Sequence, residues 1–452
     1  MKIIVCGLGK IGQTICADLV SEGHDVVVLD INRELITQLT NTHDVIGVCG
    51  NAADCTTLEE AGAADADLFI AVTHSDELNM LSCFFAKRLG AGHTVARIRS
   101  PEYNDESLGF TVKELGLSMA INPESLAASE LFDMLLLPSA MKVETFTRRK
   151  FEMVELKIKE GSVLDGVALK ELRGNFRAKV LVCVVKRDDK VYIPDGNFVL
   201  KTGDKIGITA KPSEIKHFFR KIGEMQKKAR DVIVIGGSRT AYYLAKLLTD
   251  GGFNVKIIEK NREKALELSD QLDGVTVING DGTQQELLRE EGITDADGIV
   301  TLTGRDEENI LISIYAASQR VPKVVTKVNT PELYSLGEKL GLDSIVSPRN
   351  IVSNIITRHA RALDNSAGSQ VETLYKLMDG DVEAIEFLAK SDPRFIDIPL
   401  SQLSLKENII IAGIIRGRHT IIPGGSDVIL EGDRVVVIVE NIHLRDLSDI
   451  LR

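Results

Sequence analysis

Three glycines near the start of the chain have the spacing of a loop that holds the phosphates of a nucleotide. Residues 7–12 read GLGKIG, so Gly7, Gly9 and Gly12 form a G-x-G-x-x-G pattern between an apolar strand and a predicted helix at 11–22. In such a loop the first glycine permits the tight turn, the second lets the backbone approach a pyrophosphate, and the third allows close packing of helix and strand. The N–H groups at the start of the helix then attract the anion. The predicted contacts in this loop are Gly7, Leu8, Gly9, Lys10, Ile11 and Gly12.

An acidic residue stands where a dinucleotide site places the partner of a ribose. Asp30 lies 18 residues beyond Gly12, at the end of the apolar segment VVVLD. Its carboxylate can accept hydrogen bonds from the ribose hydroxyls, and its charge would repel a 2′-phosphate, which favours NAD(H) over NADP(H). Arg33 has three interpretations: it accepts a phosphate, it lies over the adenine, or it forms an ion pair with Asp30 or Glu34.

Further polar residues follow the later strands of the same half. Asn51 and Ala52 come after VIGVCG, Thr73 and His74 come after LFIAV, and Arg97 lies late on the fifth strand. Ligands bind at the carboxyl ends of the strands in an open α/β sheet, so we expect these residues at the site. Thr73 can offer its hydroxyl to the ligand, whereas His74 is either a contact or an exposed loop residue. Arg97 either neutralises phosphate charge or pairs with a nearby acid.

The glycine pattern recurs about 230 residues later in an altered form. The segment 232–241 reads VIVIGGSRTA, in which Ser238 and Ala241 replace the second and third glycines. A Cβ at Ser238 takes up room that a pyrophosphate needs, although its hydroxyl can still donate a hydrogen bond. The predicted contacts here are Gly236, Gly237, Ser238, Arg239 and Glu259, the last of which corresponds to Asp30. A mononucleotide, NAD, or no ligand at all is compatible with this second set.

The elements that position these residues alternate regularly along each half. Continuous apolar strands separated by helices predict a doubly wound parallel sheet at 1–121 and again at 231–346. The β-branched, turn-rich segments after them predict small β-rich α+β modules at 143–226 and 370–452. We therefore predict an α/β protein with two Rossmann-like domains, each followed by such a module, and helical linkers at 122–142 and 347–369.

Each linker contains an apolar helix that begins with a proline, at 122–137 and at 347–363. Proline suits the first turn of a helix because its missing N–H would have no partner there. The first of these helices is apolar nearly all round, so something must cover it. A crossover between domains, a subunit contact, and a simple last helix of the sheet domain are the three alternatives.

Asp76, in the loop after the fourth strand, is predicted to cap a helix that begins at Glu77.

Composition limits the class of protein. The 452 residues are 44% hydrophobic and 27% charged, with a formal net charge of −12 at pH 7, which disfavours binding to nucleic acid. No run approaches the 18–20 apolar residues of a membrane span, and the opening strand leaves no room for a signal peptide, so a cytoplasmic location is expected. The six cysteines are interpreted as buried, reduced thiols, and no metal site is predicted.

The main alternative to a ligand sensor is an NAD-dependent oxidoreductase. That class needs a proton-transfer residue facing the nicotinamide, and the β-rich modules offer no such constellation, so no catalytic residue is predicted. A scaffold without working nucleotide sites is a third interpretation, but it fits the intact Gly7–Asp30 set poorly.

The motifs together resemble the RCK (KTN) domains that regulate potassium transport. The resemblance rests on GLGKIG, Asp30, the segments GNAAD at 50–54 and GDGTQ at 280–284, and a T-x-x-D-E-x-N pattern at 73–79 and 303–309. It implies two N-type and two C-type RCK domains and a gating-ring-like homotetramer. It also implies NAD(H), with ATP or ADP as further effectors. The partner implied is a potassium-translocating membrane subunit of the Trk type, with this chain held peripherally at the cytoplasmic face of the inner membrane.

Overall fold

The chain folds into two compact units that exchange segments. The computed structural model describes residues 1–452 apart from 104, 138, 147–150, 189, 225–228, 366–370, 379–380, 441–443 and 445; side chains of 105–106, 144–146, 365, 371–374 and 376 are also left out. The predicted segment ends at 226, 369 and 370 therefore lie outside the described residues. The first unit consists of Met1–Ser129, Ser238–Leu244 and Val346–Asp364, and the second of Glu130–Gly237, Ala245–Ile345 and Asn365–Arg452.

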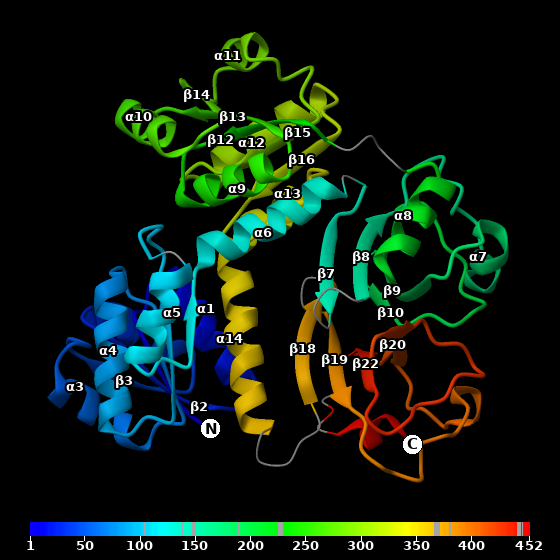
Figure 1. The fold of residues 1–452 in the computed structure, drawn as a ribbon, viewed down its shortest axis with the longest axis horizontal. Helices are drawn as coiled ribbons and strands as arrows, with labels where there is room; N and C mark the ends of the chain where they lie inside the picture. The colour runs from blue at the N-terminus through cyan, green and yellow to red at the C-terminus, as the bar shows by residue number, and fades with distance from the viewer. Residues whose placement is uncertain are drawn as a thin grey trace. The chain divides into compact units, whose positions relative to one another are not determined.

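A six-stranded parallel sheet forms the centre of the first unit (Figure 1). Its strands are β1 (Lys2–Cys6), β2 (Asp25–Asp30), β3 (Val45–Cys49), β4 (Leu68–Ala71), β5 (His93–Arg97) and β6 (Met119–Ile121), in the order β3-β2-β1-β4-β5-β6. The helices are α1 (Lys10–Ser21), α2 (Arg33–Thr42), α3 (Cys55–Glu60), α4 (Asp76–Leu89) and α5 (Asp105–Glu114). The order reverses at β1, so the carboxyl ends of β1 and β4 flank the point where a doubly wound sheet binds its ligand.

The two faces of this sheet are covered by different helices. Alternate residues such as Ile3 and Val5 face α1 and α2, while Ile4 and Cys6 face α3 and α4. The first face is also covered by α14 (Pro348–Asn365), which places Val352, Ile356 and Ala360 in the same core as Ile3. Figure 1 shows α14, in yellow, beside α1, in blue. This helix from the second half of the sequence is thus a structural part of the first sheet domain.

The second unit contains a sheet of the same topology. Its strands are β12 (Asp231–Ile235), β13 (Asn254–Glu259), β14 (Val275–Asn279), β15 (Gly298–Thr301), β16 (Lys323–Lys327) and β17 (Ile345–Val346), in the order β14-β13-β12-β15-β16-β17. The helices are α9 (Arg239–Asp250), α10 (Arg262–Gln271), α11 (Gln285–Glu290), α12 (Asp306–Ser318) and α13 (Pro331–Lys339), and the first turns of α9 belong to the first unit.

The apolar helix after the first sheet packs its C-terminal half on the second sheet domain. In α6 (Pro123–Leu136), Leu135 approaches β15 so closely that a Cβ at Gly298 would lie 3.0 Å from its Cδ2 atom. The Phe132 and Phe253 rings meet edge to face with 6.1 Å between their centroids. This packing favours a crossover between domains among the three alternatives, and the crossover stays a prediction.

Two antiparallel modules complete the second unit. The first has strands β7 (Lys142–Phe146), β8 (Phe151–Lys157), β9 (Leu181–Arg187), β10 (Lys190–Tyr192) and β11 (Lys205–Ala210) with helices α7 (Leu169–Phe176) and α8 (Pro212–Lys221). The second has strands β18 (Val371–Leu377), β19 (Val382–Leu388), β20 (Ile409–Arg416), β21 (His419–Ile421) and β22 (Arg434–Val439). Buried residues of both sheets, such as Cys183, Val184, Ala412 and Val436, form one shared core. The predicted fold class is confirmed.

Four cysteines are buried, but Cys49 and Cys55 are exposed, so the prediction of buried thiols is wrong for these two, which lie at the end of edge strand β3 and at the start of α3. Within the described part of the chain, no helix combines the length and apolar character that a membrane crossing requires.

Candidate functional site

Two of the three glycines in the first turn are required by the fold itself. Gly7 has φ +94°, and a Cβ there would lie 2.7 Å from the Thr73 nitrogen. A Cβ at Gly12 would lie 1.9 Å from the Gly7 carbonyl oxygen. The turn therefore brings the end of β1 against the loop after β4 and holds α1 close to the strand, whatever ligand is bound.

Gly9 differs because neither its backbone nor its packing demands glycine. Its φ is −65°, and a Cβ at this position would meet no heavy atom within 4 Å. Gly9 is also the N-cap of α1, and no side chain caps that end of the helix. The first N–H groups of a helix lack partners within it, so they are available to an anion in the open space beside Gly9.

Asp30 links the end of β2 to the glycine turn. One carboxylate oxygen accepts a hydrogen bond from the Leu8 nitrogen at 2.6 Å, and the other accepts one from the Asn32 nitrogen at 2.8 Å. A carboxylate has about four lone-pair sites, so two remain for ribose hydroxyls. Asp30 is thereby held in a fixed orientation next to the turn, at the place where the sequence predicts a ribose contact.

The loop after β4 is organised by a buried amide that the sequence interpretation did not assign. Asn79 is fully buried, and its Oδ1 atom accepts hydrogen bonds from the nitrogen and the hydroxyl of Thr73, both at 2.7 Å. Its Nδ2 atom donates to the Arg97 carbonyl oxygen at 2.9 Å. Since the hydroxyl proton of Thr73 is directed to Asn79, Thr73 can meet a ligand only as an acceptor.

Arg97 lies against the same loop. Its guanidinium donates to the Thr73 carbonyl oxygen, and its Nε atom has no partner within the described structure. Burial, followed by the charge of Arg99, lowers the Arg97 pKa to about 10, so the side chain stays cationic at neutral pH. Glu124 is the acid with the largest opposing effect on this pKa, and its own pKa is raised by burial. Both interpretations of Arg97, phosphate contact and partner of an acid, stay open.

The remaining predicted residues of this half lie around the edge. His74 is exposed, and its carbonyl oxygen accepts from Arg99. The Asn51 side chain accepts from the Ala53 nitrogen at 3.0 Å, and the methyl group of Ala52 is buried in the core, which leaves only its backbone for a ligand. Arg33 is exposed, and the described ion pairs include none with Asp30 or Glu34.

The predicted cap of α4 is wrong by one residue. Ser75 is the N-cap and accepts from the Leu78 nitrogen at 3.1 Å, so its hydroxyl takes the place expected for Asp76. The Asp76 carboxylate instead accepts from the nitrogens of Arg99 and Ser100, each at 2.8 Å, and so fixes the chain beyond β5. The repeated T-x-x-D-E-x-N pattern is the sequence signal for these roles of Asp76 and Asn79. The two side chains hold the loops that follow β4 and β5 at the edge of the sheet.

The second half repeats this framework. Gly236 has φ +101°, and the Glu259 carboxylate accepts from the nitrogens of Gly237 and Asn261, both at 2.6 Å. Asn309 accepts from the Thr303 nitrogen at 2.9 Å, as Asn79 does from Thr73. These residues all belong to the second unit, whereas Ser238 and Arg239 fall in the first.

Ser238 marks the difference between the two copies. Its hydroxyl oxygen accepts a hydrogen bond from the Ala241 nitrogen at 3.3 Å. A side chain therefore caps the N-terminus of α9, whereas no side chain caps the N-terminus of α1. An N–H group that is paired with a side chain is no longer free for phosphate. The start of α1 therefore keeps free a backbone N–H group that its counterpart in α9 uses for the side-chain cap.

Most of the chain matches two family models. The TrkA-N domain model matches residues 3–123 and again 232–348. The TrkA-C domain model matches residues 153–223 and 384–452. The order of the four matches is that of the four sheets.

Similar proteins cover the whole chain. It is 32% identical over 457 residues to a Trk system potassium uptake protein TrkA homolog from Archaeoglobus fulgidus, with 100% of each chain covered. It is 31% identical to the Trk system potassium uptake protein TrkA from Vibrio alginolyticus, with 98% of this chain and 96% of the other covered.

Solved structures share the fold. The GsuK channel has a TM-score of 0.65 at 18% identity, covering 97% of this chain and 77% of the other. The GsuK channel bound to NAD has a TM-score of 0.63 at the same identity and coverage.

Proposed function

The chain belongs to the TrkA family of potassium-uptake proteins, and from that premise we propose that it is a nucleotide-binding regulatory subunit of a potassium-uptake system. The proposal is supported by full-length similarity to proteins with that name. The observation that carries it is the uncapped start of α1, which lies beside open space at Gly9 and next to the oriented carboxylate of Asp30.

We propose NAD(H) as the ligand of the first sheet domain. Residues 7–12 would hold the pyrophosphate through backbone N–H groups, and Asp30 would accept from the ribose hydroxyls, as would suit NAD(H) rather than NADP(H). Asn51, Ala52, Thr73, His74 and Arg97 line the same edge of the sheet, and Arg33 begins the helix beside Asp30. The fold shared with the GsuK channel bound to NAD is compatible with this ligand.

ATP or ADP is the further ligand class in the proposal. A nucleoside di- or triphosphate presents the same phosphate and ribose groups to the turn and to Asp30, so it would compete with NAD(H) in the first half. In the second half, Glu259 is held by backbone hydrogen bonds as Asp30 is. Because Ser238 caps the start of α9, we expect a nucleotide to bind there more weakly than in the first half. Gly236, Gly237, Ser238 and Arg239 are the candidate residues there.

The partner we propose is a potassium-translocating membrane subunit of the Trk type. This chain would lie in the cytoplasm, bound peripherally to that partner at the inner membrane, as a homo-oligomer for which a tetramer is the expectation. A nucleotide can regulate transport only if it binds one arrangement of the assembly more tightly than another. The nucleotide would then shift the population of arrangements that the membrane subunit experiences.

We propose a regulatory role for this chain in place of a catalytic one. An NAD-dependent oxidoreductase would consume NADH in the presence of its substrate, whereas a regulator binds it without turnover. The test is calorimetric titration of the purified full-length chain with NADH and with ATP, paired with NADH absorbance in the presence of candidate carbonyl substrates. Binding without loss of absorbance is expected. Sustained turnover would contradict the regulatory role, and lack of any binding would contradict the nucleotide site.

A further inference from the structure

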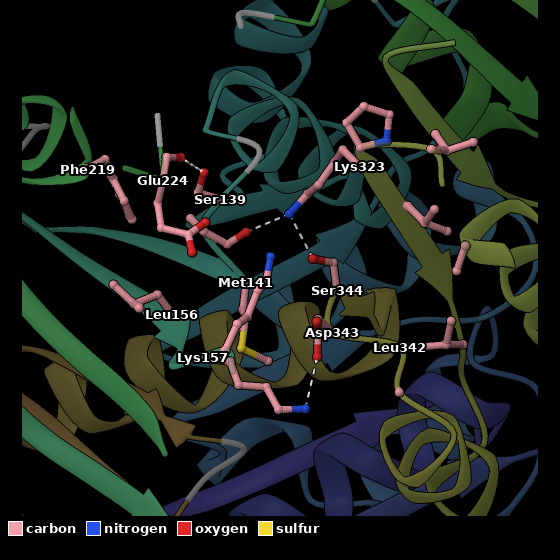
Figure 2. A pocket seen from close by; sticks show the side chains of 17 residues that line it. Ser139, Met141, Leu156, Lys157, Phe219, Glu224, Lys323, Leu342, Asp343 and Ser344 are labelled. Atoms are coloured by element: carbon pink, nitrogen blue, oxygen red, sulfur yellow. Dashed lines mark hydrogen bonds and ion pairs between the residues drawn. The ribbon is translucent and has the colours of Figure 1, made fainter. Parts of the chain in front are cut away.

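A cavity of about 140 Å³ in the second unit has none of the predicted nucleotide residues in its lining. It is found at the amino end of β16, the opposite edge of that sheet from Glu259. Its lining comes from the segment after α6, from β8 and α8 with the residues just beyond each, from the end of α12, from the start of β16, and from the loops that precede β16 and β17 (Figure 2). We call it the Lys323 cavity.

Lys323 is the central polar group of this cavity. Only 4% of the residue is exposed, and its Nζ atom donates to the Ala140 carbonyl oxygen at 2.5 Å and to the Ser344 hydroxyl at 2.8 Å. Figure 2 shows both bonds. A protonated amine has three N–H donors, so one of them remains for a further acceptor.

The side chains that line the cavity include one more lysine than acidic residues. Lys157, Lys159 and Lys323 face Glu224 and Asp343. Lys157 is paired with Asp343 at 3.3 Å, while Lys159 is exposed. Burial lowers the Lys323 pKa to about 7, because an isolated ammonium is poorly stabilised away from water. An anion beside Lys323 would supply the missing counter-charge.

The fold does not demand a buried amine at this position. The matching first residue of strand β5 in the other sheet is His93, which is exposed. A buried lysine is destabilising unless something compensates for its charge. The two hydrogen bonds of Lys323 compensate in part, and a bound anion would complete the compensation.

We propose that the Lys323 cavity binds a small monoanion that carries oxygen acceptors, most simply a monocarboxylate. Its acceptors would take the remaining N–H of Lys323 and the hydroxyl proton of Ser344, with the Lys159 ammonium at the mouth. An engineered apolar cavity of similar volume holds benzene, so the occupant has up to about six non-hydrogen atoms.

Binding of such an anion depends on the protonation of Lys323. The groups that face it are Lys157 at the end of β8, Lys159 just beyond that strand, Glu224 after α8, and Asp343 before β17. An amine with a pKa of about 7 is mostly protonated at pH 6 and mostly neutral at pH 8. The affinity for acetate, which is ionised throughout, is therefore expected to fall about tenfold over this interval.

The test is equilibrium dialysis of the full-length protein against radiolabelled acetate, and separately against inorganic phosphate, at constant ionic strength. We expect one acetate per chain, bound more tightly at pH 6 than at pH 8. Lys323→Met should remove this site, and Lys159→Gln, a change at an exposed residue that leaves folding intact, should weaken it several-fold.

The matched control is Lys256→Gln, which alters a half-buried lysine paired with Glu291 in the same sheet domain. This variant should bind acetate as the unmodified protein does. Absence of acetate and phosphate binding in the unmodified protein would overturn the proposal. Equal binding in Lys323→Met, or an equal loss in Lys256→Gln, would also overturn it, because the bound anion would then not depend on this cavity.

Discussion

Gly7, Gly9 and Gly12 share one sequence pattern but have different physical roles. Gly7 and Gly12 are needed because a Cβ at either would collide with backbone atoms, at 2.7 Å and 1.9 Å respectively. A Cβ at Gly9 would meet nothing within 4 Å, so neither backbone nor side-chain packing explains this glycine. The structure thus separates two glycines that the fold requires from a third, Gly9, that the fold does not require.

Gly9→Ala is therefore expected to fold normally but to bind NADH at least about tenfold more weakly, because its methyl group stands where the backbone must approach the pyrophosphate. Calorimetric titration measures the affinity, and thermal unfolding checks the fold. Gly109→Ala is the matched control, since that glycine is also free of neighbours within 4 Å and lies on α5. Gly12→Ala should instead be destabilised, by about 1–3 kcal/mol or more. Unchanged NADH binding in Gly9→Ala would contradict this account.

At the scale of secondary structure, the two halves differ at the start of one helix. No side chain caps the N-terminus of α1, whereas the Ser238 hydroxyl caps the N-terminus of α9 by accepting a hydrogen bond from the Ala241 nitrogen. The capping bond uses a donor that a phosphate would need, and the Cβ of Ser238 occupies the position that Gly9 leaves open. The framework of Glu259 and Asn309 is nevertheless preserved.

Ser238→Gly is expected to improve nucleotide binding in the second half, because it removes the cap and the Cβ together. Replacement of an N-cap serine by glycine costs only a few tenths of a kcal/mol, so the helix should persist. The measurement is the number of NADH sites per chain on a Gly9→Ala background. Ser238→Ala is the control, since it removes the hydroxyl but keeps the Cβ. A gain in Ser238→Ala equal to that in Ser238→Gly would show that the Cβ does not matter.

The packing of α14 gives a second prediction at this scale. Ile356 is fully buried in the core of the first sheet domain, although it lies 235 residues after β6 ends at Ile121. Ile356→Ala should lower the free energy of unfolding by about 2–5 kcal/mol. Leu340→Ala, at a residue that is 52% exposed, should change it by less than about 0.5 kcal/mol. Chemical denaturation of both variants decides whether α14 is part of this domain's core.

The sequence allowed the strands, the doubling and the fold class to be predicted because continuous apolar segments and repeated turns are local signals. The strands β6 and β17, of three and two residues, are too short to give such a signal. The sequence did not show on which sheet α6 and α14 pack, because an apolar helix face does not specify its partner. The role of Asp76 was mistaken because its partners lie 23 and 24 residues away.

At the scale of the whole molecule, each of the two sheet domains carries one set of candidate nucleotide contacts, and the two β-rich modules share one core. The shared core of the two β-rich modules joins the halves of the sequence, and the exchanged helices do so again. Regulation by population shift requires that a nucleotide bind one arrangement of the assembly more tightly than another.

The central claim is tested most directly by potassium uptake into vesicles that contain the membrane subunit and this protein. NADH or ATP is added on the side of this protein, and uptake is compared between the unmodified chain, Gly9→Ala and Gly109→Ala. The account predicts that nucleotide changes the rate of uptake with the unmodified chain and with Gly109→Ala, and that Gly9→Ala loses most of the response to NADH. A response that is the same in Gly9→Ala, or no response with any chain that binds nucleotide, would contradict it.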